Sequence, residues 1–467
     1  MVQAKTLPRN EEGISTVLGV LKQQFGEQLH TGKTIREQHA HTTTWIDNQA
    51  PDAVVFPAST ADVVEIVKTC AAHRVPIIPF GTGTSLEGHV NAPAGGISVD
   101  LSQMNRILAV HGEDLDCVVE PGVTREDLNT HLRDQGLFFP IDPGANASIG
   151  GMASTRASGT NAVRYGTMRD NVIGLEAVMA DGTVIRTATR ARKSSAGYDL
   201  TRLLIGSEGT LGLITEITLK LHGIPEAISS ARCSFPSVDA ACQAVISVIQ
   251  FGIPVARIEL LDEMTVRAVN AYSGLSLPET PLLLLEFHGS QASVVEQSQS
   301  FGEIAEEFGA TGYAATTSTE ERNKLWQARH DAYWATLQLR PGAQGISTDV
   351  CVPISRLAEC VTQCKAKLAD LGILAPVVGH VGDGNFHCLL LIDGDDANEV
   401  SRAAGFVSWL NDLAISMEGT CTGEHGIGQG KMPYLVKELG PATGYMAAIK
   451  VALDPNGIMN PGKIITV

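Results

Sequence analysis

Three glycine-rich segments interrupt the first half of the chain, and they limit which folds it can adopt. They lie at 81–88, 142–166 and 206–212, among short apolar runs and stretches with helical periodicity. Long loops of small residues are poor connectors in a compact domain and are usually functional. Because small side chains let the backbone approach a bound molecule closely, three such loops suit a large flat ligand. Three independent turns are the alternative interpretation of this pattern.

The apolar runs around these loops predict alternating strands and helices. In the first half we expect strands at 54–56, 75–80, 97–101 and 117–120, helices at 60–73 and 124–135, and a hairpin at 175–186. After 223–225 the pattern changes to strands at 231–235 and 282–287 with helices at 237–251 and 292–308. This second pattern indicates a sheet covered on one face by helices. One further helix is expected over 320–340.

The charge balance excludes several classes of partner. A formal net charge of −17 argues against binding to nucleic acid or to an anionic membrane surface. The 44% hydrophobic content is that of a globular protein, and a chain of 467 residues suggests two or three domains. No run approaches the roughly 18 apolar residues that a membrane span needs, and the N-terminal residues lack a signal-peptide pattern.

The nine cysteines show no Cys-x-x-Cys pair and no regular spacing. Cys360 and Cys364 are spaced by one helical turn in an amphipathic stretch, so we expect both to be buried apolar residues. This usage fits a reducing compartment. A cytoplasmic location is expected, with peripheral attachment to a membrane through a partner left open.

Two short motifs near the C-terminus concentrate the chemically active side chains, at 379–387 and 423–428. Apolar runs on both sides of the turn at 382–384 predict a hairpin in which His380 and His387 face each other. With Glu424 they form a set of two imidazoles and one carboxylate, which is common for a catalytic divalent metal. His425 would lie beside the metal, where a base is useful. Satisfied core histidines and a plain turn are the alternative.

The segment at 81–88 follows a predicted strand, as a phosphate-binding loop does. Glycines free successive backbone N–H groups to bind an anion, and Thr82, Thr84 and Ser85 add hydroxyl donors. Leu86 replaces the third glycine of a dinucleotide fingerprint, and the Gly-Lys-Ser/Thr ending of a nucleoside-triphosphate loop is missing. The loop alone therefore identifies no particular nucleotide.

In combination, these motifs resemble a known family. The segments 79–88, 143–144 and 206–210 resemble the FAD-binding domain of the vanillyl-alcohol oxidase / p-cresol methylhydroxylase (PCMH) superfamily. The C-terminal motifs, with Asn460-Pro461-Gly462, resemble its FAD-linked oxidase C-terminal domain. The segments 325–331 and 348–356 are most similar to the D-lactate dehydrogenase (cytochrome) group, whose relatives include D-2-hydroxyglutarate dehydrogenase and the glycolate oxidase FAD subunit.

The resemblance implies an α+β fold with a two-subdomain PCMH-type FAD-binding domain at 1–222. A substrate domain with an antiparallel sheet and helices follows at 223–415, and 416–467 would complete the active site and return to the FAD domain. The residues implied in binding the cofactor are Phe80, Gly81, Thr82, Gly83, Thr84, Ser85, Gly88, Pro143, Gly144, Ser148, Gly150, Gly151, Ser154, Gly159, Asn161, Glu208, Gly209, Gly212, Ile214 and Asn460. Since the loop tip offers Thr84 and Ser85, with His89 only beyond it, noncovalent FAD is expected.

The implied reaction is oxidation of a D-2-hydroxy acid to a 2-oxo acid by hydride transfer to flavin N5. Zn or Mn on His380, His387 and Glu424 would acidify the substrate hydroxyl, and His425 would accept its proton. The resemblance further implies that Arg329 pairs with the substrate carboxylate and that Asn385 also contacts the substrate. A surface charge on a helix is the alternative for Arg329.

A small or apolar substrate side chain, as in D-lactate, is expected. No lysine occurs at 345–348, where relatives acting on 2-hydroxyglutarate carry one, and Leu389 is apolar. D-2-hydroxyglutarate and glycolate remain alternative substrates, and a non-redox flavoenzyme and a metal hydrolase are rival activities. The electron acceptor is expected to be a cytochrome, a quinone or an electron-transfer flavoprotein. A homodimer is the expected assembly.

Overall fold

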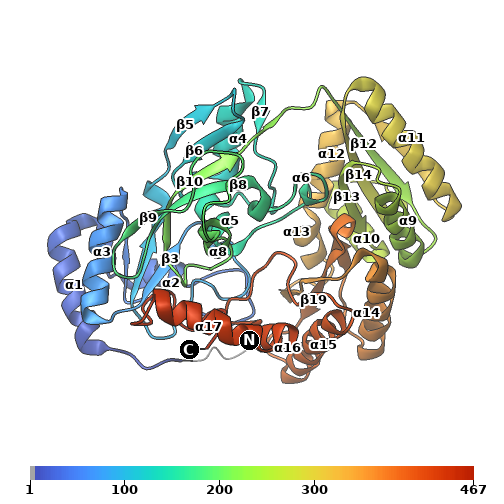
Figure 1. Ribbon diagram of the computed structural model, residues 1–467. Coiled ribbons are helices and arrows are strands. Elements are labelled where there is room, and N and C mark those ends of the chain that lie inside the picture. The colour runs from blue at the N-terminus through green and yellow to red at the C-terminus, as the bar shows by residue number, and fades with distance from the viewer. Residues whose placement is uncertain (1–5, 467) are drawn as a thin grey trace. The chain divides into compact units, whose positions relative to one another are not determined.

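The computed structural model describes residues 6–466 (Figure 1). These residues divide into two compact units, which we call the N-terminal unit (6–158, 166–224 and 424–466) and the central unit (159–165 and 225–423). The main changes of unit lie at 224/225 and 423/424, where the sequence placed divisions at 222/223 and 415/416. The short excursion of 159–165 into the central unit was not anticipated.

A four-stranded sheet opens the N-terminal unit, in the order β1 (Leu29–His30), β2 (Ala53–Val55), β4 (Ile97–Asp100) and β3 (Ile77–Phe80). The last three strands are parallel. Helices α1 (Glu11–Phe25) and α3 (Thr60–His73) pack together beside it (Figure 1). The predicted helix at 60–73 is confirmed, because Ser59 caps the N–H of Asp62 and an apolar stripe from Val63 to Cys70 is buried.

The second sheet of this unit has five antiparallel strands, in the order β5 (Ile107–His111), β6 (Asp116–Val119), β10 (Leu213–Lys220), β8 (Val172–Val178) and β9 (Val184–Arg186). The predicted hairpin is confirmed as β8 and β9, and Asp181 accepts the N–H of Thr183 in its turn. Helix α4 (Arg125–Arg133) is capped by Thr124, and β7 (Leu137–Phe138) pairs with β11 (His222–Gly223).

The sequence suggested that the segment 142–166 is one long loop, but the structure shows that it is not. It contains α5 (Ile149–Thr155) and α6 (Ala162–Tyr165). Ile149, Met152 and Ala153 of α5 are buried in the core of the unit. Position 150 of this helix requires a glycine, because a Cβ there would come 2.5 Å from Cβ of Pro121. A glycine required by close packing was therefore interpreted as a loop residue.

The central unit is built on an eight-stranded antiparallel sheet in the order β15-β12-β14-β13-β18-β19-β16, with β17 paired to β19. The strands are β12 (Ala227–Ser234), β13 (Val255–Leu261), β14 (Leu282–Gly289), β15 (Thr311–Thr316), β16 (Gln344–Ser347), β17 (Val350–Cys351), β18 (Val377–Gly379) and β19 (Asn385–Ile392). This sheet and the three of the N-terminal unit, together with the helices, make the chain an α+β protein, as expected.

Helices cover parts of both faces of this sheet. On one face lie α9 (Val238–Gln250) and α11 (Gln291–Glu307) (Figure 1). Phe301 of α11 packs against Phe287 of β14. Leu282 and Leu284 point to the other face, where they pack with α10 (Glu263–Ser273) and with Trp326 and Ala332. The expectation that only one face would be covered was wrong.

The predicted helix at 320–340 is two helices, α12 (Thr319–His330) and α13 (Ala332–Leu337). Asp331 separates them, and its carboxylate accepts hydrogen bonds from the side chains of Gln327 and Ser273. A tertiary contact with α10 thus holds the residue at which the two helices meet.

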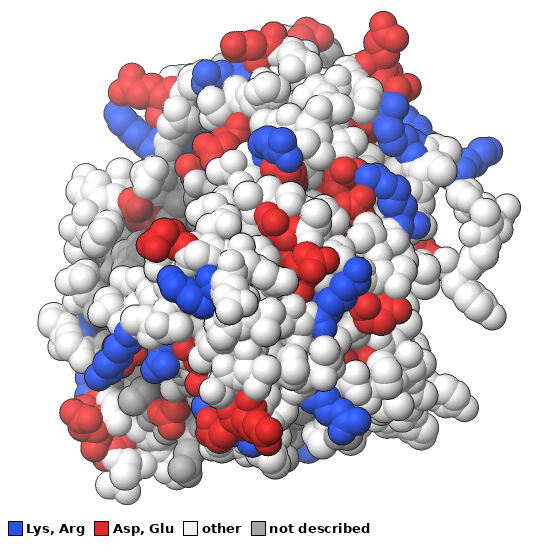
Figure 2. All heavy atoms as spheres, turned by 90° about the vertical axis from the view of Figure 1, so that its left-hand side faces the viewer, with Lys and Arg blue, Asp and Glu red and all other residues white. Residues whose placement is uncertain are grey.

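The remaining helices are α2 (Lys33–Gln38), α7 (Met168–Asn171), α8 (Leu200–Leu204), α14 (Leu357–Leu371), α15 (Ala397–Ser416), α16 (Met432–Leu439) and α17 (Ala442–Leu453). Cys360 and Cys364 are buried on α14, as predicted. Among residues 6–466, no helix combines the length and the apolar character of a membrane span. On the face in Figure 2, acidic and basic side chains are interspersed. This face has no broad basic area of the kind that binds nucleic acid.

Candidate functional site

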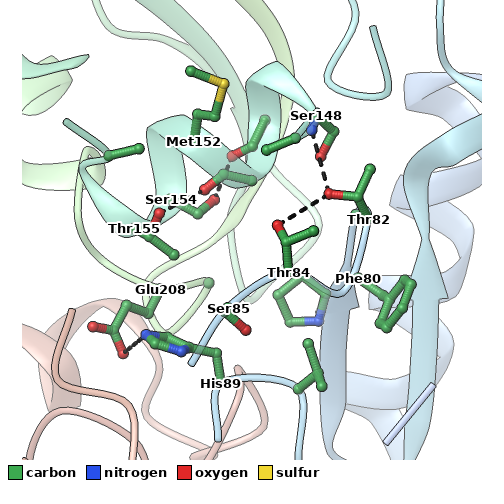
Figure 3. Close-up of a pocket in the computed structure, with 18 of the residues that line it drawn as sticks. Phe80, Thr82, Thr84, Ser85, His89, Ser148, Met152, Ser154, Thr155 and Glu208 are labelled. Carbon is green, nitrogen blue, oxygen red and sulfur yellow. Dashed lines mark hydrogen bonds and ion pairs between the residues drawn. The ribbon is translucent and has the colours of Figure 1, made fainter. Parts of the chain in front are cut away.

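A cavity in the N-terminal unit is lined by all three glycine-rich segments (Figure 3). Its empty space is about 1220 Å³, including the part open to solvent. The predicted cofactor residues in its lining are Phe80, Gly81, Thr82, Gly83, Thr84, Ser85, Pro143, Ser148, Gly150, Gly151, Ser154, Glu208, Gly209, Gly212, Ile214 and Asn460.

The hydroxyl groups of this cavity fit a phosphate-bearing ligand. Thr82 and Thr84 lie 3.4 Å apart through their hydroxyl oxygens, and the backbone N–H of Ser148 points to Thr82 Oγ1 (Figure 3). The Oγ atoms of Ser85 and Ser148 are buried, and neither has a hydrogen-bond partner among the described residues. Because a buried hydroxyl without a partner is costly, a ligand that accepts these hydrogen bonds would stabilise the site.

Several lining residues were not predicted from the sequence. Met152 and Thr155 come from α5, whose helical character was missed, and His89 lies just beyond the first glycine loop. A helical spacing of Ile149, Met152 and Ala153 was the available signal for α5. The predicted contacts Gly88 and Gly144 are not in the lining, and Gly159 and Asn161 belong to the central unit.

Glu424 and His425 also line this cavity. Both belong to the N-terminal unit, although the residue before them, Gly423, belongs to the central unit. The predicted base is thus in the pocket that fits the cofactor.

The predicted hairpin with two histidines is confirmed in the central unit. Strands β18 and β19 pair so that Val378 lies opposite His387, and a short 3-10 turn, Val381–Asp383, joins them. His380 directly follows β18, and the two imidazole rings have centroids 5.5 Å apart. The chain therefore brings both predicted ligands together within one unit.

Each of these imidazoles uses its Nδ1 atom in a hydrogen bond to the protein. His380 Nδ1 lies 2.7 Å from Glu259 Oε1, and His387 Nδ1 lies 2.9 Å from the carbonyl oxygen of Thr348. Such acceptors make Nδ1 the protonated nitrogen and fix the ring, so Nε2 is the ring atom with a lone pair that could coordinate a cation. Histidines that ligate a metal usually donate their other ring N–H to a carboxylate or a backbone carbonyl in this way.

Glu259 on β13 joins the histidine pair to Arg329. Its second carboxylate oxygen accepts the Nε–H of Arg329 at 2.7 Å, and the carboxylate is almost completely buried. Burial alone would raise the pKa of Glu259, but His380 and Arg329 outweigh it and lower the pKa. Sequence analysis missed this residue. The signal was a carboxylate in the middle of an apolar strand, 255–261.

Asn385 and Asp349 form the other side of the histidine pair. Asn385 Nδ2 donates to Asp349 Oδ1 at 2.7 Å and to the carbonyl of Val350 at 2.8 Å. Asp349 also accepts from the hydroxyl of Thr422, and Gly423 packs against both side chains. The Asn385 amide therefore supports the hairpin, and its contact with a substrate stays a prediction.

A polar network surrounds Glu286 on the same face of the sheet. His288 Nε2 lies 2.8 Å from Glu286 Oε1, Ser230 Oγ donates to Oε2 at 3.1 Å, and the guanidinium of Arg257 lies over the Trp326 ring at 4.6 Å. The excursion 159–165 is held here, since Asn161 Oδ1 accepts from Arg257 Nε. A direct protein contact thus occupies the side chain that was predicted to bind FAD.

This network predicts that acid destabilises the central unit. Burial would raise the pKa of Glu286, but Arg257, His288 and Ser230 together lower it to about 2, from an ordinary value of 4.5. Since the folded-state pKa is the lower one, the stabilisation is complete above about pH 4.5 and is lost as the pH falls toward 2. The shift corresponds to about 3 kcal/mol.

Glu286→Gln should flatten this pH dependence, measured as urea unfolding between pH 6 and pH 3 followed by tryptophan fluorescence. The matched control is Glu320→Gln, whose carboxylate is exposed on α12 and pairs with Lys324. Equal pH dependence in the two variants would contradict the assignment.

Comparison with known proteins identifies the family. Residues 51–188 match the model of the FAD binding domain, and residues 224–464 match that of FAD linked oxidases, C-terminal domain. The chain belongs to the FAD-linked oxidases. Within this family it is 52% identical over 443 residues to the probable D-lactate dehydrogenase, mitochondrial, of Danio rerio, covering 94% of this chain and 89% of that protein.

Other relatives agree with this membership. The chain is 50% identical to D-lactate dehydrogenase [cytochrome], mitochondrial, of Arabidopsis thaliana, over 89% of this chain and 73% of that protein. Among solved structures it resembles p-cresol methylhydroxylase with substrate bound, with a TM-score of 0.80, 16% identity and 99% of each chain covered. The latter likeness concerns the fold and confirms the PCMH-type architecture of this family member.

Proposed function

We propose that this protein is an FAD-dependent dehydrogenase of D-2-hydroxy acids with a small or apolar side chain, D-lactate first among them. The observation that carries the proposal is that the Glu259 carboxylate contacts both Arg329 and His380 of the histidine pair, and so holds them side by side in the central unit. A 2-hydroxy acid has a carboxylate adjacent to a hydroxyl group. A guanidinium next to a cation-binding pair matches those two groups.

His380, His387 and Glu424 are the proposed ligands of a divalent cation, either Zn or Mn. Fixed Nδ1 hydrogen bonds on both histidines support this assignment. When bound, such a cation supplies a Lewis acid for the substrate hydroxyl. Two nitrogens and a carboxylate accept both metals. Titrating Zn and Mn into protein from which a chelator has removed the metal would show which of them binds more tightly.

The residues of the chain have separable tasks in the reaction. Arg329 holds the substrate carboxylate with its Nη groups, because Glu259 already accepts its Nε–H. His425 accepts the hydroxyl proton as C2 is oxidised. The loop hydroxyls of Ser85 and Ser148 hold the phosphates of FAD, which supplies the electron acceptor when bound. We propose that FAD is bound noncovalently, and acid precipitation that releases all of the flavin would agree.

The neighbourhood of Leu389 supports a small or apolar substrate side chain. Leu389 lies two residues after His387 on β19, so both side chains point to the same face of the strand. Its strand partner β16 carries Gly345, and a Cβ there would come 3.1 Å from Leu389 and 3.6 Å from the Tyr333 hydroxyl. Neither β16 nor Leu389 offers a cation for a second carboxylate.

Anaerobic titration of the flavin absorbance tests this function. D-lactate should bleach the oxidised flavin, while L-lactate should not, and D-2-hydroxyglutarate should act at least 10-fold more weakly, because its second carboxylate would be buried without a partner. Equal bleaching by D-lactate and D-2-hydroxyglutarate would contradict the proposed specificity. Flavin that none of these acids reduces would favour a non-redox flavoenzyme.

The partners follow from the same proposal. Reduced flavin must pass its electrons to an acceptor, for which a cytochrome, a quinone or an electron-transfer flavoprotein is proposed. A homodimer and a cytoplasmic location stay predictions, which sedimentation and cell fractionation would check.

A further inference from the structure

Glu208 has its carboxylate buried within the N-terminal unit, although it lies in the glycine-rich segment that was predicted to bind the cofactor. Its oxygens accept the backbone N–H groups of Ile427 at 2.7 Å and Gly428 at 2.8 Å. These amides belong to the motif that contains His425. The carboxylate therefore links the third glycine-rich segment to the motif of the predicted base.

His89 completes this contact from the first glycine-rich segment. Its Nε2 lies 3.3 Å from Glu208 Oε2, and both side chains are buried in the lining of the cofactor cavity (Figure 3). Gly426 packs directly onto the pair. A Cβ at this position would come 2.7 Å from Glu208 Oε1 and 2.8 Å from His89 Nε2, and the φ of +82° already favours glycine.

The electrostatics favour an ionised carboxylate at this position. Burial by itself would raise the pKa of Glu208, but His89 and the two backbone N–H donors outweigh burial and lower the pKa. Hydrogen bonds from N–H groups to a charged carboxylate are shorter and stronger than neutral ones. An anion in this place would repel the phosphates of FAD, so it is poorly suited to bind them.

The backbone around Glu208 is itself firmly held. Asn460 Nδ2 donates to the carbonyl oxygens of Glu208 at 2.8 Å and His89 at 3.1 Å. Lys463 Nζ donates to Asn460 Oδ1 at 3.1 Å and to the carbonyl of Asn91 at 2.8 Å. Glu208 also adopts a left-handed backbone conformation, with φ of 54°, which non-glycine residues rarely adopt. Such strain persists where the surroundings fix the residue.

We propose that Glu208 is a positioning residue for His425, and that its carboxylate fixes the imidazole in the cofactor cavity by anchoring the backbone at Ile427 and Gly428. This inference rests on the proposed role of His425 as the base. The anchor lies two and three residues beyond His425, close enough that its loss changes where the imidazole points. Displacing a catalytic group by about 1 Å can cost roughly 100-fold in rate.

Glu208→Gln tests the proposal, because it keeps the shape and removes the charge and one acceptor. Hydrogen exchange of the peptide 424–430, measured on the FAD-loaded protein, should become roughly 10- to 100-fold faster at Ile427 and Gly428, as expected for losing a hydrogen bond to a charged group. The kcat for D-lactate should fall at least 10-fold with little change in KM. The FAD content should stay that of the unsubstituted protein.

The matched control is Glu120→Gln. Glu120 is a similarly buried carboxylate of the same unit, but it pairs with Arg106 instead of the His425 motif. Exchange at 424–430 and kcat should be unchanged in this variant. Loss of FAD from Glu208→Gln with unchanged exchange at 424–430 would overturn the proposal in favour of a cofactor contact. Unchanged exchange and unchanged kcat would overturn it outright.

A second variant keeps the test usable if Glu208→Gln does not fold. In Gly426→Ala the added methyl group must displace the Glu208–His89 pair, so exchange at Ile427 and Gly428 should again accelerate while FAD is retained. Unchanged exchange at Ile427 and Gly428 in Gly426→Ala would overturn the proposal that Glu208 anchors this backbone. Because exchange and flavin content are measured without turnover, they distinguish a failed anchor from a failure of the proposed D-lactate activity.

Discussion

His425→Ala is expected to lower kcat for D-lactate by about 10²- to 10⁴-fold, the usual contribution of a general base. His425 lines the cofactor cavity, but the phosphate-directed hydroxyl groups come from Ser85 and Ser148. FAD and metal should therefore stay bound. The rate of anaerobic flavin reduction by D-lactate measures the effect without involving the electron acceptor.

The control for this variant is His131→Ala, which removes an exposed imidazole of α4 in the same unit. It should reduce flavin at the normal rate. A His425→Ala protein that turns over nearly as fast as the control would remove His425 from the mechanism. Loss of flavin from His425→Ala would instead assign the imidazole to cofactor binding.

Glu259→Gln is expected to have the second-largest effect, because it breaks a buried cluster of charges. A neutral amide can no longer balance Arg329, and removing one partner of a buried ion pair costs about 3–5 kcal/mol of unfolding free energy. It also weakens the acceptor that fixes His380 Nδ1, so metal affinity should fall roughly 10- to 100-fold. Both changes originate in the central unit.

Urea unfolding followed by tryptophan fluorescence measures the loss of unfolding free energy. Titration of Zn or Mn into protein from which a chelator has removed the metal measures the loss of metal affinity. The matched control is Glu263→Gln, a partly exposed carboxylate of α10 that pairs with Lys365. It should keep normal metal affinity. If Glu259→Gln binds metal as tightly as this control, Glu259 does not orient the histidine ligand.

Local sequence patterns were sufficient for many of the elements. Helix α3 was predicted to its observed bounds, because Asp62 lies in its first turn and Val63 to Cys70 form one apolar stripe. The hairpin of β18 and β19 was predicted because two apolar runs flank a glycine turn. In these cases the deciding contacts lie within a few residues, so a sequence window contains them.

Elements that depend on distant partners were missed. Gly150 is required inside α5 by Pro121, and without that knowledge the segment resembled a loop. The split between α12 and α13 involves Ser273 of α10. The excursion at 159–165 is held by Arg257, which lies 96 residues from Asn161. No local pattern contains such information.

By itself, the sequence determined the chemical inventory of this protein: three glycine-rich segments, two histidines across a turn, and the Glu424-His425 pair. These are fixed by residue type and short spacing. Only the tertiary structure decided which residues orient them, since Glu259 reaches His380 from 121 positions away and Glu208 reaches Ile427 from 219. The physical reason is that a buried charge needs a partner in space, and the chain can supply that partner from any position.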